Sequence, residues 1–322
     1  MTIVCRSFAK INLGLRIGPA RADGFHELLT VYQTIALHDV IRVSVERGSG
    51  IEIKCSDPRV PGDDSNTCHR IVDRAMPVLG AKGRVVIEID KRLPVQGGLG
   101  GASSNAIATL VGLERALRKK LGAAERLSIA AEVGSDLPLF LVGGTVLGVG
   151  RGEQVYPLPD LPPIHCVVLT PEIGVSTPKA FAEWDRRNVD AKLTASASSD
   201  RMKELGRGLS AWLSEPYSSA PSSFTGRGRA ENPLLWLVRA GIENDFEQVV
   251  FPEYPELCEG KRALGHAGAK YASLSGSGST LYGLFVSKAA AERAAVRLRK
   301  QGWAAQATVT LTRRSYWSRI FD

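Results

Sequence analysis

The stretch Pro94-Val95-Gln96-Gly97-Gly98-Leu99-Gly100-Gly101-Ala102-Ser103-Ser104 decides the fold, because it places four glycines between a strand and a helix. Before it, Val85 to Ile89 is an apolar run that predicts a strand. After it, apolar residues recur at helical spacing from Ile107 to Leu121, with Ser103 and Ser104 placed to cap the start and Gly122 the end. Glycines let a backbone approach a ligand closely, and a helix start offers unpaired N–H groups to an anion. This order of elements predicts a phosphate site.

The loop matches neither of the two common nucleotide-binding motifs. It is not a Walker A loop, because no Gly-Lys-Ser or Gly-Lys-Thr follows, and Ser103 stands at the third glycine position of the dinucleotide fingerprint. A second loop of the same character, Leu274-Ser275-Gly276-Ser277-Gly278-Ser279-Thr280, precedes another apolar run. Either loop alone is also compatible with a flexible turn. Two of them in one chain favour a phosphate held from two sides.

Further segments carry strand and helix patterns. Phe8 to Ile17 alternates apolar and polar residues, which predicts a half-buried strand. Ile41 to Val45 and Ile51 to Ile53 alternate on either side of turn residues 47–50, which predicts a hairpin. The other predicted elements are helices over Ala123 to Val133, Arg201 to Leu213 and Lys288 to Lys300, and strands over Cys166 to Leu169, Leu281 to Val286 and Ala304 to Leu311.

The length of 322 residues suggests two domains. Four prolines within seven residues suit an extended connector between them, namely Pro157, Pro159, Pro162 and Pro163. We therefore expect one domain over residues 1–161 and a second over 162–322. The segment from Asp190 to Ala230 is Ser-rich and poor in long apolar residues, which predicts an insertion with a mobile loop near residues 190–230 of the second domain.

Charge and hydropathy limit the classes of function. The net charge of +8 fits either a nucleic-acid surface or an enzyme with phosphate ligands, and charge alone leaves both open. The longest uncharged stretch, Tyr271 to Ser287, has 17 residues with five Ser and three Gly, too short and too polar for a bilayer span. Basic residues interrupt every apolar run near the N-terminus, so we expect a cytoplasmic protein. The five cysteines are widely spaced, which argues against a zinc site or a disulfide framework.

Three polar residues have the side chains that phosphoryl transfer needs. Lys10 and Asn12 share the polar face of the first strand, and Asp136 follows the second predicted helix. The reaction requires a cation near the moving group and a carboxylate near the attacking hydroxyl. A solvated edge lysine and a helix-capping aspartate would show the same pattern. Phe25 and His26 could stack on a base or could anchor a loop.

These motifs together resemble a known superfamily. Pro94 to Ser104, Gly134 to Pro138 and Leu274 to Thr280 resemble the three motifs of the GHMP kinases, which include galactokinase, homoserine kinase, mevalonate kinase and phosphomevalonate kinase. Ser7 to Leu13 and Arg21 to Glu27 resemble the family within it that phosphorylates 4-diphosphocytidyl-2-C-methyl-D-erythritol. Further matches are Asn66-Thr67, Gly150-Arg151-Gly152-Glu153, Ser176-Thr177-Pro178 with Phe181, and Asn244-Asp245-Phe246-Glu247.

The resemblance implies a reaction and its residues. The γ-phosphoryl group of ATP would move to the 2-hydroxyl of the cytidine diphosphate substrate, in the non-mevalonate route to isoprenoid precursors. Asp136 would accept the hydroxyl proton, and Lys10 would orient Asp136 and the hydroxyl and offset charge. Mg²⁺ would accompany ATP, with Ser104 as a metal ligand. The implied ATP-binding residues are Pro94, Val95, Gln96, Gly97, Gly98, Leu99, Gly100, Gly101, Ala102, Ser103 and Ser104. The implied substrate residues are Asn12, Thr177, Phe25 and Phe181 on either side of the cytosine, and His26 at its polar edge.

The implied fold is α+β with two domains and the active site between them. The first would be a ribosomal-protein-S5-domain-2-like α/β domain with a left-handed crossover, and the second a ferredoxin-like domain. The partners would be small molecules, with the chain a monomer or a homodimer. Three features depart from the family pattern: Ala102 replaces a glycine, Phe25 stands where tyrosine is common, and the segment from Asp190 to Ala230 is longer than expected.

Two alternatives to this assignment stay open on the sequence. A sibling kinase would act on mevalonate, a phosphomevalonate or homoserine, but the elements around Phe25 and Phe181 have no role without a cytosine. A nucleic-acid-binding protein would use Gly226-Arg227-Gly228-Arg229 and Arg313-Arg314. Those short basic pairs lack the interleaved aromatic residues that stack on bases.

Overall fold

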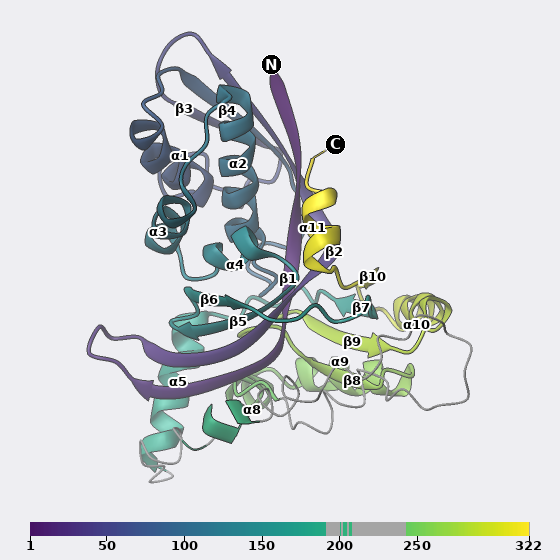
Figure 1. Ribbon diagram of the computed structural model, residues 1–322. Helices are drawn as coiled ribbons and strands as arrows, with labels where there is room; N and C mark the ends of the chain where they lie inside the picture. Colours follow the sequence, from purple (N-terminus) through teal and green to yellow (C-terminus); the bar gives the residue numbers. More distant parts are fainter. Residues whose placement is uncertain (191–199, 201, 205, 208–242, 322) are drawn as a thin grey trace.

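The computed structural model describes residues 1–190, 200, 202–204, 206–207 and 243–321. Its two sheets form two layers of the described molecule (Figure 1). The first sheet contains β1 (Thr2–Ala20), β2 (His26–Glu46), β3 (Ile51–Cys55), β4 (Arg84–Asp90), β5 (Thr145–Gly150) and β6 (Gln154–Pro157). The second contains β7 (His165–Leu169), β8 (Tyr271–Leu274), β9 (Leu281–Phe285) and β10 (Ala305–Val309). The helices are α1 (Thr67–Val78), α2 (Gly101–Leu117), α3 (Ala123–Val133), α4 (Leu137–Val142), α5 (Thr177–Asp190), α8 (Glu247–Glu253), α9 (Pro255–His266), α10 (Lys288–Lys300) and α11 (Arg313–Ser318).

The first sheet corrects the predicted hairpin between residues 41–45 and 51–53. Val45 pairs antiparallel with Val85 of β4, and Ile51 pairs with the same residue in parallel, so β4 lies between β2 and β3. The apolar residues of β4 are buried, whereas β3 is half-exposed, so burial favours β4 at the inner position. The chain connects the parallel strands β3 and β4 through α1, and the predicted left hand of this crossover stays a prediction.

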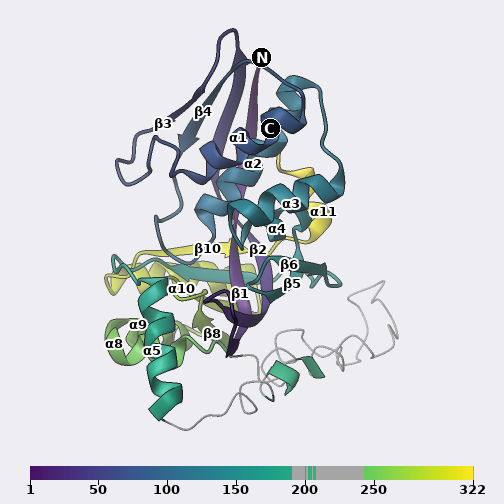
Figure 2. The ribbon, with the colours of Figure 1, turned by 90° about the vertical axis from the view of Figure 1, so that its left-hand side faces the viewer.

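Helices α1, α2 and α3 cover one face of the first sheet (Figure 2). Helix α2 begins one residue after Gly100, whose φ of +67° is a left-handed conformation that glycine adopts without strain. Ser103 and Ser104 lie inside the helix, so the predicted capping by these residues is wrong. The predicted end at Gly122 is also wrong, because the helix ends at Leu117 and Gly122 is the N-cap of α3. Helices α3 and α10 occupy their predicted ranges.

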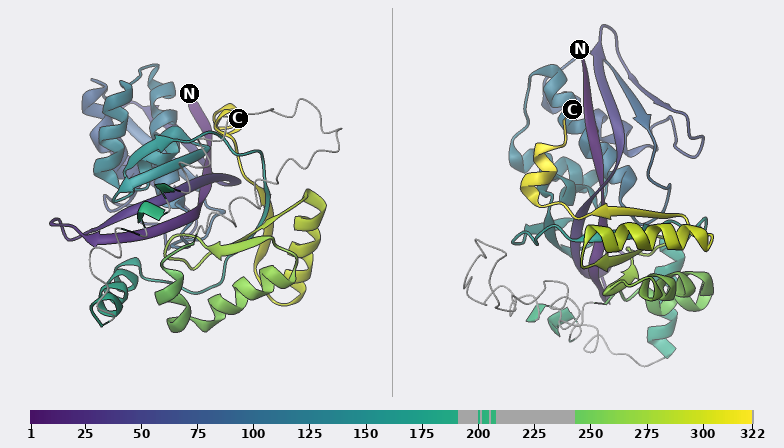
Figure 3. Two further views of the ribbon diagram at one scale, coloured as in Figure 1. Left: turned by 60° about the horizontal axis from the view of Figure 1, so that its bottom comes forward. Right: turned by 90° about the vertical axis from the view of Figure 1, so that its right-hand side faces the viewer.

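The second sheet packs different residues on its two faces. Leu281 and Phe285 of β9 contribute to a core with α8, α9 and α10, whereas Tyr282 and Leu284 face a core with β1 and β2. Such alternation is a property of strand geometry. Figure 3 shows α9 and α10 beside the second sheet. The predicted two-domain α+β fold is confirmed.

The end of the described chain returns to the first core. Leu311, Tyr316 and Ile320 pack there with residues of β1 and α2, and the Tyr316 hydroxyl donates to Phe140 O at 2.8 Å. Helix α11 therefore lies beside β1 and β2 (Figure 1). The boundary between residues 161 and 162 stays a prediction. Most of the predicted helix over 201–213, and all of residues 226–229, lie outside the described residues.

Two expectations concern membrane contact and cysteine chemistry. Across the described ranges, no helix is long and apolar enough to cross a bilayer. The five cysteines are free thiols. Burial raises the pKa of the Cys68 and Cys166 thiols to about 12, so both stay protonated near neutral pH.

Candidate active site

Strand β1 and the start of α4 bring Lys10, Asn12 and Asp136 together. Lys10 Nζ lies 2.6 Å from Asn12 Oδ1 and 3.5 Å from Asp136 Oδ2. The Lys10 side chain is 4% exposed and that of Asp136 33%. A solvated edge lysine is therefore excluded, and the carboxylate remains open to a ligand. Asp136 also makes no capping hydrogen bond to α4.

Sequence reasoning missed Tyr32, a fourth member of this cluster. Tyr32 pairs with Asn12 across β1 and β2, and its hydroxyl donates to Asp136 Oδ1 at 3.0 Å. Burial, reinforced by the nearby Asp136 charge, raises the pKa of Tyr32 well above its usual value, so the phenol stays a proton donor. Lys10 Nζ also lies 5.6 Å from the centre of the Tyr32 ring. The alternation of β2 could have placed Tyr32 on one face, but not opposite Asn12.

The two glycine loops contact one another. Thr280 N donates to Gly97 O at 3.1 Å, and Ser275 Oγ donates to Gly98 O at 3.0 Å. Gly98 has a φ of +77°, and a Cβ there would lie 2.2 Å from Ser275 O. Only glycine fits so close an approach of two backbones. Lys10 N donates to Leu99 O at 3.0 Å, which joins the same loop to β1.

The first loop lines a cavity of about 370 Å³. The predicted ATP-binding residues from Pro94 to Ser103 all contribute to its wall. Ser104 faces away, because its hydroxyl is buried, donates to Phe8 O at 2.6 Å and accepts from Ser7 Oγ at 2.8 Å. Residues outside the loop complete the wall: Arg59, Val60, Pro61, Ser65, Asn66, Thr67, Ile89, Lys91 and Asn105.

Two cations at this cavity escaped the sequence analysis. Lys91 and Arg59 both line it. Lys91 Nζ pairs with the fully buried Asp39 at 2.6 Å, and the other Asp39 oxygen accepts from the backbone N–H groups of Arg92 and Leu93. The strand preceding the loop is thereby held in place. Lys91 lies two residues after the predicted strand and precedes the loop, a position that could have signalled it.

The predicted substrate residues form two groups. His26 stacks on Phe181 with ring centroids 5.0 Å apart, and His26 Nε2 lies 2.7 Å from Asp185 Oδ1. Phe25 is 50% exposed, with the Arg151 guanidinium 4.9 Å from its ring centre. Phe181 thus stacks on His26 rather than on Phe25.

Thr177 reaches the second glycine loop. Its Oγ1 lies 2.7 Å from Ser277 Oγ. Both residues line a second cavity of about 380 Å³, which shares Gln96 and Gly98 with the first. The two cavities therefore meet at the first glycine loop.

Two family descriptions match this chain. The GHMP kinases N terminal domain matches residues 66–144, which include the first glycine loop and Asp136. The GHMP kinases C terminal domain matches residues 234–303, which include the second loop.

Curated relatives and solved structures extend the match. A protein of Solibacter usitatus named 4-diphosphocytidyl-2-C-methyl-D-erythritol kinase is 37% identical over 90% of this chain and 83% of its own. The protein of that name from Acaryochloris marina is 35% identical over 90% and 89%. A crystal structure of 4-(cytidine 5'-diphospho)-2C-methyl-D-erythritol kinase covers 96% of this chain and 99% of its own, with a TM-score of 0.70 at 28% identity. Homoserine kinase from Cytophaga hutchinsonii has the same TM-score at 20% identity, covers 97% and 95%, and shares the fold. The chain therefore belongs to the GHMP kinases and, within them, to the 4-diphosphocytidyl-2-C-methyl-D-erythritol kinase family.

Proposed function

We infer that this chain transfers the γ-phosphoryl group of ATP to the 2-hydroxyl of 4-diphosphocytidyl-2-C-methyl-D-erythritol, in the methylerythritol phosphate route to isoprenoid precursors. The observation that carries this inference is the cluster of Lys10, Asn12 and Asp136 beside two touching glycine loops. Relatives with that activity in their names match over about nine-tenths of the chain. The structures of homoserine kinase and mevalonate kinase are 20% and 14% identical to this chain, so they show a shared fold and do not indicate a different substrate.

We propose that Asp136 is the general base and that Lys10 is the cation beside it. The exposed carboxylate can reach a substrate hydroxyl, whereas Lys10 is buried behind it. When the hydroxyl oxygen bonds to the γ-phosphorus, the bond from that phosphorus to the bridging oxygen breaks and ADP leaves. The hydroxyl proton passes to Asp136, and the Lys10 charge stabilises the developing negative charge. Asn12 accepts from Lys10 and donates to Thr30 Oγ1 at 2.8 Å, so its first role is to fix Lys10. We propose that Asn12 also contacts the substrate.

We propose that ATP occupies the 370 Å³ cavity with its phosphates at Gly97 to Gly101. The N–H groups at the start of α2 suit a polyphosphate. Mg²⁺ usually binds through substrate phosphates, one or two protein oxygens and water. Within the part of the chain that the structure describes, no group of three metal-ligating side chains gathers, which fits a metal carried by the nucleotide. The half-buried Ser103 fits as a protein oxygen better than Ser104, whose hydroxyl is bonded to β1. Bound Mg²⁺ would neutralise phosphate charge.

The cytosine would bind near His26 and Phe181. Asp185 orients the His26 ring, so that its other nitrogen can hydrogen-bond the base edge. Phe25 offers an exposed aromatic face for stacking, in spite of lacking the tyrosine hydroxyl. Thr177, which lies beside Ser277, would contact the diphosphate.

We propose a cytoplasmic enzyme, monomeric or homodimeric, with small-molecule partners and no nucleic acid. Cytidine nucleotides and ATP account for its phosphate-binding loops. Arg313 is one residue of the basic pair considered for nucleic acid. Its guanidinium donates to Thr145 O and Leu158 O, so these donors are engaged within the protein.

A substrate comparison tests the proposed function. Purified protein is given ATP and Mg²⁺ with the cytidyl substrate, mevalonate or homoserine, and ADP release is measured. We expect turnover of the cytidyl substrate at least about 100-fold above the others, because only it fills the aromatic subsite. Turnover of mevalonate or homoserine alone would refute the assignment.

A further inference from the structure

We propose that Asn244 is a positioning residue for phosphoryl transfer, whose side-chain amide holds the second glycine loop against Lys10 and Asn12. The inference rests on the proposed function and adds a role for the segment Asn244 to Glu247. That segment resembles the family pattern in sequence, but it contributes no residue to the proposed ATP site or substrate site.

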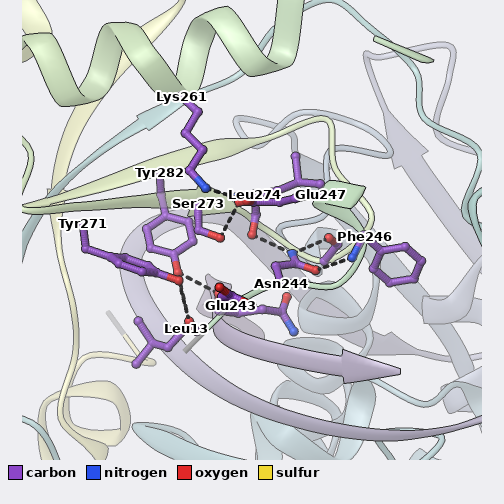
Figure 4. A network of polar contacts seen from close by, with 12 residues as sticks. Leu13, Glu243, Asn244, Phe246, Glu247, Lys261, Tyr271, Ser273, Leu274 and Tyr282 are labelled. Atoms are coloured by element: carbon purple, nitrogen blue, oxygen red, sulfur yellow. Dashed lines mark hydrogen bonds and ion pairs between the residues drawn. The ribbon is translucent and has the colours of Figure 1, made fainter. Parts of the chain in front are cut away.

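Both N–H groups of the Asn244 amide are committed to the loop. Asn244 is 2% exposed, and its Nδ2 donates to Leu274 O at 2.9 Å and to Gly276 O at 2.8 Å (Figure 4). Its Oδ1 accepts from Phe246 N at 3.1 Å. An amide satisfied at both ends is rigid, so it fixes the two carbonyls that flank Ser275.

The backbone of the same segment is anchored to the catalytic strand. Leu15 N donates to Glu243 O at 2.9 Å, and Asp245 N donates to Leu15 O at 3.0 Å. The buried Asp245 carboxylate accepts from Ile17 N at 2.9 Å and from Arg16 Nη1 at 2.9 Å. Asn244 therefore joins β1, which carries Lys10, to the glycine loop.

The loop held by Asn244 lies beside two polar side chains of β1, those of Lys10 and Asn12. A Cβ built on Gly276 would lie 3.5 Å from both Lys10 Nζ and Asn12 Oδ1, an ordinary van der Waals distance, so the Gly276 Cα faces these two atoms. The Tyr282 hydroxyl, beyond the loop, donates to Asn12 O at 2.8 Å (Figure 4). A displaced Gly276 would thus move the Lys10 ammonium relative to Asp136.

A second side chain supports this loop from behind. Glu247 Oε1 accepts from Ser273 Oγ at 2.8 Å and from Leu274 N at 2.9 Å, and Lys261 pairs with its other oxygen (Figure 4). Both backbone polar groups of Leu274 are therefore held by side chains of the Asn244 to Glu247 segment. Two anchors on one residue leave the start of the loop little freedom to shift.

The test is Asn244→Asp, which keeps the shape of the side chain but removes both N–H donors. The new carboxylate faces two carbonyl oxygens, so the loop shifts, while the acceptor for Phe246 N remains. A misplacement of about 1 Å can cost about 100-fold in rate. We expect kcat to fall about 30- to 100-fold, with KM for ATP and for the cytidyl substrate within about threefold of the wild type.

The matched control is Ser287→Ala, which removes the N-cap hydrogen bond from Ala290 N to Ser287 Oγ at the start of α10. It should lower Tm and leave kcat unchanged. A kcat for Asn244→Asp equal to that of the control overturns the proposal, as does a change confined to KM. If Asn244→Asp does not fold, Asn244→Ser withdraws the same pair of N–H donors from Leu274 O and Gly276 O, and an unchanged kcat there overturns the proposal. Absence of turnover in the wild type would instead refute the proposed function.

Discussion

Replacing Gly98 by alanine tests whether the contact between the two glycine loops governs the use of ATP. A Cβ on Gly98 would lie 2.2 Å from Ser275 O, well inside the 3.4 Å at which ordinary van der Waals contact begins. Because the obstacle is backbone, the loops must separate by roughly 1 Å, and a displacement of that size costs about 100-fold in rate. We expect kcat/KM for ATP to fall about 100-fold in Gly98→Ala.

Gly302→Ala separates this effect from backbone strain. Gly302 has a φ of +91°, and a Cβ there meets no atom within 4 Å. This variant suffers the left-handed penalty alone, about 1–2 kcal/mol of unfolding free energy. Steady-state kinetics at varied ATP and urea unfolding should be measured for both variants. Equal kcat/KM for ATP in the two variants would refute the role of the loop contact.

Three further predictions follow from the site. Asp136→Asn and Lys10→Ala should each lower kcat by a few orders of magnitude, with ATP affinity by calorimetry nearly intact; wild-type kcat would remove that residue from the chemistry. Phe181→Ala should weaken binding of the cytidyl substrate by about 1–3 kcal/mol through lost stacking, measured as a higher Kd, and unchanged affinity would place the base elsewhere. Burial raises the pKa of Tyr32 and Tyr282 well above the unfolded value near 10, so their contribution to stability is complete below pH 10 and declines as pH rises further. The unfolding free energy should fall above pH 10 by up to about 1.4 kcal/mol per pH unit for each phenol, and a flat profile by urea titration would contradict this.

Local patterns in the sequence predicted the local elements well. Helix α10 occupies its predicted range because its alanines and leucine recur on one face. Strand pairing was harder, because alternation identifies a strand and not its partner. Ile51 pairs with Val85, which lies across the whole of α1 in the chain, so no turn signal could reveal it.

In the candidate site, too, the sequence could identify residues that lie in local motifs but not residues whose role depends on strand pairing. Lys10 and Asp136 could be named because motifs carry them, and the structure brings them within 3.5 Å. Tyr32 could not, since its role depends on the register that places it opposite Asn12. The cap assigned to Ser104 failed because the hydroxyl bonds to β1, a contact between residues far apart in sequence.

The return of the chain end to the first core has a consequence for synthesis on the ribosome. Arg6 N donates to Ile320 O at 2.7 Å, and the backbone of Cys5 forms an antiparallel β-bridge with Phe321, so the first strand is completed by residues made about 300 positions later. Domains ordinarily fold in order as they emerge, at about 5–20 residues per second. Here the first domain must wait, with a gap where Leu311, Tyr316 and Ile320 belong, until these residues have been synthesised. A nascent chain stalled before residue 311 should therefore remain protease-sensitive in its first domain.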